Sequence, residues 1–563
     1  MDPSLRTKLD RVTNILFAGG VNNPVTYIEQ LGYLIFLKLL DERESELELQ
    51  RRLTKATNGG PKSLFPDQAN RYRWTEWRFK SGETLREFLH GDVFPYMASL
   101  VREEPQVALY FQDARMEIDD PNVLKQVVDE LDGIAFNKLG TDVKGDIYEY
   151  LLTYLNTLEG SLLGQFRTPR QIRLAMVAML DPDLGDTIHD PACGTAGFLV
   201  DAVEHILAKY SEHPREISIY GEEWLDRRGQ TLEQARAEIP TLQTYRKGAG
   251  EKIPDWNLLE RSIFGFDVSR QMMRISMMNL ILHGIRGAGV KRANVLSETG
   301  GLSDEDIRRR YKVILSNPPF AGVLPKESIR DDLPTASKKS ELLFLGLMMQ
   351  ELAPGGRCAV VVPEGALFGS TKAHVELRKK LVEDFDLQAV VSLPAGVFKP
   401  YAGVKTGILV FRKPPEAAPA KGKAGKAGTR ADGHHVWFYE VRADGFDPDK
   451  ITRGTRPETP EKNDLPDLLA QWTAYKASGF KKPPGIESGT LLPYDAQEPR
   501  SWFAAVSTIV ENEYNLAAGR YKPQCSEKAP DENPADLIRQ TLDVEREIAQ
   551  GLERLLKEVE GVA

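Results

Sequence analysis

Two short segments of the sequence combine glycine, proline and polar residues in a way that could bind a ligand and act on it. The first, residues 190–198, reads Asp-Pro-Ala-Cys-Gly-Thr-Ala-Gly-Phe and lies between a strand-like and a helix-like run. Glycines in such a turn let the backbone pass close to a ligand, and the following helix N-terminus favours polar groups. The spacing is not the G-x-G-x-x-G of dinucleotide enzymes, and a tight structural turn is the alternative. With the acidic Asp190 at the strand end, the pattern favours a cofactor site.

The second segment, residues 316–320, reads Ser-Asn-Pro-Pro-Phe and follows another apolar run. Asn317 carries both a donor and an acceptor, the two prolines stiffen the backbone, and Phe320 offers a flat face for stacking. This set suits a planar amine, whose N–H groups need acceptors while its ring is stacked. The alternative is a proline-stiffened turn without a ligand. A binding role is favoured because the segment follows a strand, downstream of the glycine turn in the same predicted sheet.

These segments must be positioned by a sheet. From about residue 161 to 412, short apolar runs rich in β-branched residues alternate with helical stretches. This alternation predicts an α/β fold with a doubly wound parallel sheet, which binds ligands at the carboxyl ends of its strands. The predicted strands cover residues 187–189, 262–266, 312–315, 358–362, 389–393 and 407–411.

The flanking regions differ in pattern. Residues 1–160 contain apolar residues at helical spacing and predict a separate helical domain. The α/β domain is expected over 161–445, with a surface loop at 414–433, which consists mostly of Ala, Gly, Pro and Lys. Residues 446–534 are predicted to form an irregular extension, and 535–563 to contain a long amphipathic helix.

Composition limits the class of protein. With 563 residues, of which 41% are hydrophobic and 28% charged, the chain is neither mainly disordered nor fibrous. Its net charge of −9 argues against a generally basic surface that grips nucleic acid unaided. The three cysteines lie far apart, so neither a disulfide framework nor a zinc site is expected, and a reducing cytoplasm fits. No segment is predicted to cross a membrane.

The two chemical segments together resemble the motifs of DNA methyltransferases that transfer a methyl group from S-adenosylmethionine to an exocyclic amine. Residues 165–170, Gln-Phe-Arg-Thr-Pro-Arg, narrow the resemblance to the modification (M) subunit of type I restriction–modification systems. Other similar segments are residues 278–284, 354–357, 361–363, 393–398, 403–406, 514–516 and 519–521. The resemblance covers roughly residues 1–525. It implies a helical N-terminal domain and a Rossmann-like, S-adenosylmethionine-dependent methyltransferase domain.

The resemblance also implies roles for individual residues. Asn317 and the carbonyl of Pro318 are expected to bind the amino group that is methylated. Pro319 and Phe320 complete the catalytic motif, and Phe320 stacks on a base flipped out of the duplex. The expected cofactor-binding residues, besides the acid that holds the ribose, are Gln165, Phe166, Arg167, Thr168, Pro169, Arg170, Asp190, Ala192, Gly194, Thr195, Ala196 and Gly197.

An acidic residue after the second strand is expected to hold the ribose hydroxyls of the cofactor. The spacing of about 20 residues found in dinucleotide sites favours Glu222 or Glu223. Asp267, in contrast, follows the predicted strand 262–266 and precedes a helix-like run that resembles the family. We therefore predict that Asp267 holds the ribose and that residues 211–261 are an insertion.

The resulting hypothesis is methylation of N6 of a flipped-out adenine in double-stranded DNA, at a site chosen by a separate specificity (S) subunit. The C-terminal helix is expected to dock on that subunit, although its own domain could also cover its apolar face. A second M subunit and, in the full complex, a restriction (R) subunit are the other expected partners. Methylation of cytosine N4 or of a protein glutamine stays open, since both present a planar amine, as does a non-catalytic assembly role.

Overall fold

The computed structural model describes most of the chain. The described residues are 3–21, 23–54, 63–102, 104–136, 147–148, 150–152, 168–210, 256–285, 287–320, 322–399, 403–415, 434–447, 449–450, 456–482, 500–523, and scattered positions between 539 and 552. Four sequence predictions therefore lie largely or wholly outside the described residues: the surface loop, the cofactor segment 165–167, the insertion up to residue 255 and the C-terminal helix at 535–563. In the part that is described, no helix is long and apolar enough to cross a membrane.

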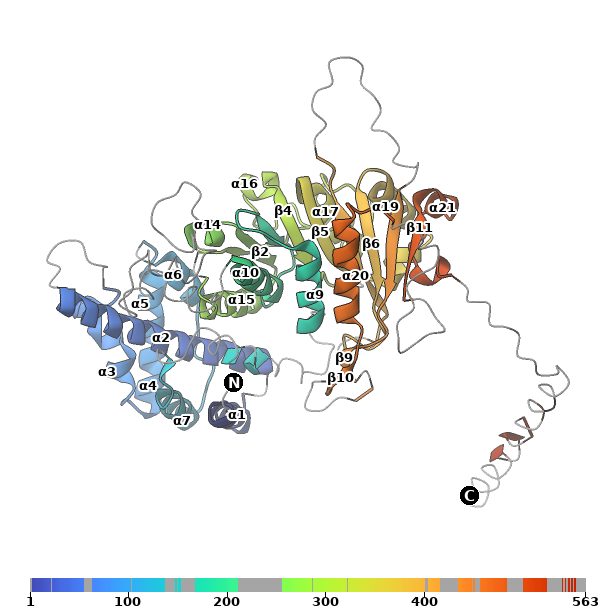
Figure 1. Ribbon diagram of the computed structural model, residues 1–563. Coiled ribbons are helices and arrows are strands. Elements are labelled where there is room, and N and C mark those ends of the chain that lie inside the picture. Colours follow the sequence, from blue (N-terminus) through green and yellow to red (C-terminus); the bar gives the residue numbers. More distant parts are fainter. Residues whose placement is uncertain are drawn as a thin grey trace, which may run out of the picture.

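The N-terminal region is helical, as the sequence predicts, and lies at one end of the molecule (Figure 1). The rings of Tyr33 and Phe36 pack against those of Tyr110 and Phe111 in its core, with centroids 4.8–5.8 Å apart. Its elements are α1 (Pro3–Ala18), α2 (Pro24–Thr54), η1 (Asp67–Tyr72), α3 (Trp74–Trp77), α4 (Gly82–Phe88), η2 (Leu89–Val93), α5 (Phe94–Ser99), α6 (Pro105–Phe111) and α7 (Pro121–Asp132).

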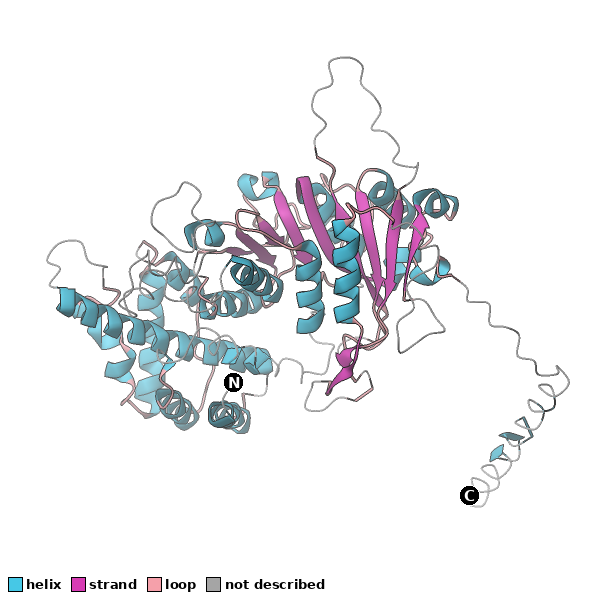
Figure 2. Ribbon diagram, viewed as in Figure 1, coloured by secondary structure: helices cyan, strands magenta, loops and turns pink. Residues whose placement is uncertain are grey.

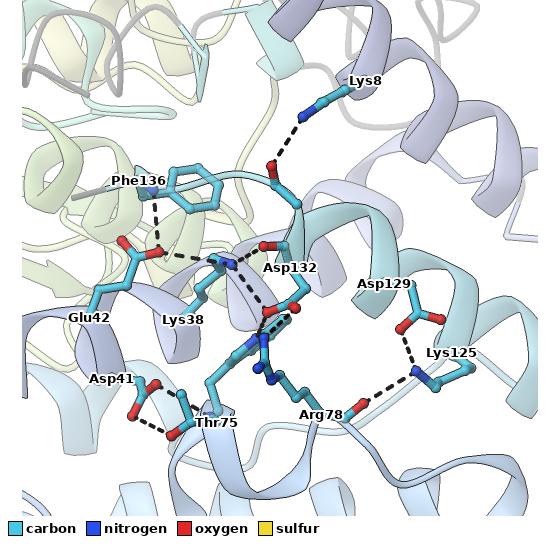
Figure 3. Close-up of polar contacts among 12 residues, drawn as sticks. Lys8, Lys38, Asp41, Glu42, Thr75, Arg78, Lys125, Asp129, Asp132 and Phe136 are labelled. Atoms are coloured by element: carbon cyan, nitrogen blue, oxygen red, sulfur yellow. Dashed lines mark hydrogen bonds and ion pairs between the residues drawn. The ribbon is translucent and has the colours of Figure 1, made fainter. Parts of the chain in front are cut away.

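Polar contacts fix the end of α7 to the rest of this domain (Figure 3). Asp132 accepts hydrogen bonds from the indole Nε1 of Trp74 at 2.8 Å and from the guanidinium of Arg78. The Lys38 ammonium donates to the Asp132 carbonyl at 2.8 Å and lies 3.9 Å from Glu42. Although desolvation by burial alone would raise the pKa of Asp132, these donors hold it below its usual value, so the carboxylate stays ionised between two cations.

The α/β region is built on one nine-stranded sheet, with the strand order β11-β8-β6-β7-β5-β4-β1-β2-β3. Each of the six predicted strands overlaps one of these strands. The strands are β1 (Ile188–Asp190), β2 (Ile263–Asp267), β3 (Gly289–Arg292), β4 (Tyr311–Ser316), β5 (Leu352–Pro363), β6 (Asp386–Ser392), β7 (Thr406–Arg412), β8 (His435–Glu440) and β11 (Ser501–Ala505).

The sheet is mixed, and the expectation of an all-parallel sheet is wrong in this respect. β3, β2, β1, β4 and β5 are parallel, whereas β7 inserts antiparallel between β5 and β6, and β11 is antiparallel to β8. The described part of the connection between β6 and β7 contains turns and no helix. Strands joined without a crossover helix pair in opposite directions, which accounts for β7.

Helices cover both faces of the sheet (Figure 2). Alternate residues of β4 enter different cores: Val313 and Leu315 face one apolar cluster, and Ile314 faces the other. The first cluster contains residues of α9 (Arg170–Leu180), α10 (Gly197–Tyr210), α15 (Arg270–Leu282) and α20 (Leu465–Ala477), and continues into the helical domain. The second contains residues of α17 (Ser340–Glu351) and α19 (Lys372–Glu383). The predicted doubly wound α/β class is therefore confirmed.

The region 446–534 is not the irregular extension that its proline-rich sequence predicted. It supplies β11, which extends the main sheet, and α20, which packs beside α9 (Figure 1). The indole Nε1 of Trp472 in α20 donates to the carbonyl of Met179 in α9 at 2.8 Å. The five residues of β11, Ser-Trp-Phe-Ala-Ala, pair antiparallel with β8 along their whole length. Shorter elements are α14 (Trp256–Arg261), α16 (Asp304–Arg308), η6 (Lys326–Ser328), α18 (Glu364–Phe368), β9 (Asp444–Phe446), β10 (Glu458–Asn463), α21 (Val506–Glu511) and η7 (Ala518–Arg520).

Candidate active site

The predicted chemical residues come together at the carboxyl edge of the parallel strands. β1 pairs with β2 on one side and with β4 on the other. Asp190 ends β1, Asp267 ends β2, and Asn317 follows the last residue of β4. The strands β2 and β3 lie on one side of β1, and β4 and β5 lie on its other side. The strand order therefore reverses at β1, and doubly wound sheets bind ligands at this switch point.

The glycine turn after β1 is held in an unusual backbone conformation. Gly194 and Ala196 have positive φ values of 52° and 61°. The Asp190 carboxylate accepts a hydrogen bond from the backbone N–H of Ala192 at 3.0 Å, which closes the start of the turn. A Cβ added at Gly194 would meet no atom within 4 Å. The backbone angle of residue 194 therefore favours glycine, and open space lies beside it for a ligand.

Helix α15 holds this turn from behind. The Asn279 amide Nδ2 donates to the carbonyl of Thr195 at 2.8 Å, and the Ser276 hydroxyl donates to the carbonyl of Gly194. Both side chains are fully buried. The turn is thus held by α15 through two of its carbonyls and by Asp267 through the backbone N–H of Gly194.

Asp267 lies beside the glycine turn, as a ribose-binding acid must. Its Oδ2 accepts a hydrogen bond from the Gly194 N–H at 3.2 Å, and its Oδ1 accepts one from the Ser269 N–H at 2.7 Å. Burial raises the pKa of Asp267 to about 6, although these two hydrogen bonds favour the ionised form. Glu222 and Glu223 lie outside the described residues.

The segment after β4 is joined to the glycine turn through buried hydrogen bonds. The hydroxyl of Ser316, which is fully buried, donates to Asp190 Oδ1 at 2.7 Å. Burial raises the pKa of Asp190 to about 6, and the hydrogen bond from Ser316 opposes this shift. The next side chain, Asn317, donates through Nδ2 to the hydroxyl oxygen of Thr168 at 2.9 Å. The structure therefore brings together three sequence motifs that lie far apart along the chain.

Phe320 lies half-buried at the same edge. Its ring contacts that of Phe398 edge-to-face, with centroids 6.3 Å apart, and the Pro319 carbonyl accepts from the Ser340 hydroxyl at 3.1 Å. Phe398 belongs to the family-like segment 393–398 between β6 and β7. The aromatic contact fixes the orientation of Phe320, the residue predicted to stack on the target base.

Two of the predicted cofactor residues near residue 165 have polar partners outside the glycine turn. Thr168 is buried against Asn317, and the Arg170 guanidinium lies 3.5 Å from the carboxylate of Glu204 in α10. Gln165, Phe166 and Arg167 are not among the described residues. Residues that the sequence analysis missed in this region are Arg173, Asp201, Ser276, Asn279 and Ser316. Each of these is a polar side chain within an otherwise apolar helix or strand, and this pattern could have identified them from the sequence.

The helical domain contacts the back of the site through α15. Arg274 of α15 forms a buried ion pair with Glu29 of α2 and donates to the Gln112 carbonyl at 2.6 Å. Burial raises the pKa of Tyr33 above its usual range, so its hydroxyl stays protonated and donates to Glu29 at 2.8 Å. Because α15 also carries Ser276 and Asn279, the helical domain supports the helix that holds the glycine turn.

Comparison with known proteins identifies the family. A model described as N-6 DNA Methylase matches residues 139–234 and 251–529, and one described as the HsdM N-terminal domain matches residues 5–131. The chain is thus a DNA methyltransferase by class and belongs to the N-6 DNA methylase family. The predicted resemblance to type I M subunits is confirmed, and so is S-adenosylmethionine as the cofactor of this class.

Individual relatives agree with this assignment. The chain is 29% identical to the type I restriction enzyme EcoEI methylase subunit of Escherichia coli over 559 residues, which are 97% of this chain and 95% of the relative. A solved chain of a type I R-M system, studied for complex assembly and conformational transition, matches over 99% of both chains with a TM-score of 0.63 and 27% identity. A type I methyltransferase subunit from Streptococcus thermophilus, at 17% identity, shares the fold with a TM-score of 0.61 over 92% of this chain and 99% of its own.

Asp267 provides a direct test of the cofactor site. Replacing Asp267 with alanine should weaken S-adenosylmethionine binding by about 1–3 kcal/mol, the scale of hydrogen bonds to a charged group. Glu223→Ala is the matched control and should change the affinity little. Isothermal titration calorimetry on the two variants measures both. The reverse order of the two variants would show that Glu223 holds the ribose.

The affinity of the unmodified chain for S-adenosylmethionine should also fall as the pH is lowered through 6. Burial raises the pKa of Asp267 to about 6, so below this pH the carboxylate is protonated and loses its negative charge.

Proposed function

We propose that this chain methylates N6 of adenine in double-stranded DNA, as the modification subunit of a type I restriction–modification complex. The observation that carries this proposal is the placement of Asn317 at the end of β4. There, Ser316 ties the backbone to Asp190 of the glycine turn, and Thr168 binds the amide of Asn317. This is the geometry that an amino-group methyltransferase needs, with the acceptor for the amine next to the turn that faces the cofactor.

The residues present fit S-adenosylmethionine. Gly194 leaves open space beside its Cα, and the buried carboxylate of Asp267 lies at the end of the neighbouring strand. Asp267 would hold the ribose hydroxyls, and residues 190–197 and 165–167 would surround the rest of the cofactor. When bound, S-adenosylmethionine supplies an electrophilic methyl group on a sulfonium centre.

The motif after β4 would hold the substrate amine. The carboxamide oxygen of Asn317 and the carbonyl of Pro318 accept the two N–H groups, which increases the electron density on the nitrogen. Phe320 stacks on the base, which must leave the duplex for its amine to be reached. The two acceptors and the stacked ring would hold the amine in place, so these residues would contribute chiefly through positioning and electrostatics.

The target sequence would be chosen by a specificity subunit. The relatives are named methylase subunits, and one solved relative comes from work on complex assembly of the type I system. The described positions between 539 and 552 are helical, and Leu542, Ile548 and Leu552 are 47%, 58% and 61% exposed there. An apolar set of this kind favours a helix that docks on a partner. We infer that the partner is the specificity subunit, with a second M subunit and a restriction subunit in the full complex.

The assembly itself tests the proposal. Co-expression with the specificity protein of the same system should give a stable complex that forms N6-methyladenine in DNA from a host lacking the enzyme. The isolated chain should bind the cofactor but methylate no defined site, because an acidic subunit alone binds DNA weakly. The product is identified by digestion and mass spectrometry.

A truncated chain lacking residues 535–563 separates docking from chemistry. It should keep cofactor affinity and lose co-purification with the specificity protein. Sequence-specific methylation by the single chain would contradict partner dependence. Formation of N4-methylcytosine by the complex would instead reject adenine as the target.

A further inference from the structure

The sequence resemblance groups Thr168 with the cofactor-binding residues, but its contacts lie elsewhere. Its hydroxyl oxygen accepts the hydrogen bond from Asn317 Nδ2 at 2.9 Å, and the side chain is 6% exposed. The donor nitrogen and the acceptor oxygen of a carboxamide lie in one plane, on opposite sides of the bond that joins the group to the side chain. An acceptor that fixes the nitrogen therefore also fixes the direction of the oxygen.

The backbone of Thr168 is itself held in place by a buried ion pair. Arg173, one turn into α9, donates through Nη1 to the Thr168 carbonyl at 2.9 Å and through Nε to Asp201 Oδ2 at 2.6 Å. Arg173 and Asp201 are 3% and 2% exposed. A Cβ at Gly197 would lie 2.8 Å from the Arg173 guanidinium carbon, so glycine at this position makes room for the arginine.

The ion pair thus joins three parts of the site. α9 supplies Arg173, α10 supplies Asp201, and the segment before α9 supplies Thr168, which reaches Asn317 beyond β4. On its other side, Asn317 follows Ser316, whose hydroxyl is bound to Asp190. Both the backbone before Asn317 and its side-chain amide therefore have fixed hydrogen-bond partners.

We propose that Thr168 is a positioning residue for catalysis, whose hydroxyl holds the amide nitrogen of Asn317 so that the amide oxygen faces the substrate amine. The inference rests on the proposed function of Asn317 and deepens it. Without the Thr168 acceptor, the amide of Asn317 can rotate and present its NH₂ group to the amine, where two donors oppose each other. The contribution of Thr168 is then to the turnover rate and not to the affinity for the cofactor.

Three variants of Thr168 in the complex with the specificity protein test this role. Thr168→Val keeps the shape and removes the hydroxyl, and Thr168→Ser keeps the hydroxyl. We expect Thr168→Val to lower kcat about tenfold, the scale of a lost orienting contact, with a Kd for S-adenosylmethionine within about twofold of the original. Thr168→Ser should restore most of the rate. Thr168→Ala should also lower kcat and leave the Kd for S-adenosylmethionine unchanged. Agreement between the two variants would show that the loss of rate does not come from poor folding of Thr168→Val.

Thr473→Val is the matched control, because Thr473 is an exposed threonine in α20 whose hydroxyl donates to the Leu469 carbonyl at 2.7 Å. It should leave both constants unchanged. An unchanged kcat in Thr168→Val, or a loss of cofactor affinity equal to the loss of rate, overturns the inference.

Asn317→Ala, measured alongside, separates the hypothesis about Thr168 from the hypothesis about Asn317. If Asn317→Ala is inactive and Thr168→Val is fully active, only the role of Thr168 fails; if Asn317→Ala is active, the proposed function of Asn317 fails.

Discussion

Asn317→Ala should reduce methyl transfer at least about 100-fold while S-adenosylmethionine still binds. The substitution removes an acceptor aimed at the amine, and loss of one preorganised hydrogen-bonding group at a reaction centre costs about 10²–10³ in rate. Asp267 is held by the N–H groups of Gly194 and Ser269, and the glycine turn is held by α15, so the cofactor pocket should persist. Transfer of tritiated methyl groups to DNA by the assembled complex measures the rate, and calorimetry measures the affinity.

A matched control for this variant is Asn122→Ala, at an exposed asparagine near the start of α7. It should keep full activity, because it lies in the helical domain and contacts none of the residues of the site. Retention of more than about a tenth of the original rate in Asn317→Ala would show that the acceptor is not needed for the chemistry. A parallel loss of rate and cofactor affinity would show that the substitution disturbs the whole edge of the sheet.

Asp201→Ala should lower the free energy of unfolding by about 3–5 kcal/mol, since it leaves the Arg173 guanidinium charged and buried without its partner. The pair has an Nε–Oδ2 distance of 2.6 Å and is almost fully enclosed between α9 and α10. Urea unfolding, followed by tryptophan fluorescence, measures the change. The variant should also lose methylation activity, because Arg173 without Asp201 would no longer be fixed in the position from which it donates to the Thr168 carbonyl.

Glu376→Ala provides the comparison for this prediction. It removes the partner of Lys372 in an ion pair of α19 whose side chains are 88% and 61% exposed, with a distance of 3.7 Å. Exposed pairs of this kind contribute little, because water solvates both groups equally well when they separate. A midpoint shift in Asp201→Ala no larger than that in Glu376→Ala would mean that the Arg173–Asp201 pair does not hold the two helices together.

The sequence by itself determined the elements and motifs that depend on local pattern. Strand-like runs before Asp190, Asp267 and Asn317 are apolar and β-branched, and each overlaps a strand of the sheet. Glycine at position 194 widens the range of backbone angles open to the turn, and the two prolines after Asn317 restrict theirs, in each case by the chemistry of the residue itself. The N-terminal helices likewise follow from the spacing of apolar side chains. The class of protein could be predicted because these signals lie within short stretches.

The tertiary structure decided which groups meet. Thr168 and Asn317 are 149 positions apart, and nothing in either segment names the other as its partner. A buried arginine such as Arg173 needs an acidic partner, yet the chain contains 82 acidic residues and only packing selects Asp201. The direction of β7 and the addition of β11 to the sheet depend on neighbouring strands in the same way. Hydrogen bonds and strand pairs are formed between groups that folding brings together, so their partners are fixed by the three-dimensional arrangement and not by local sequence.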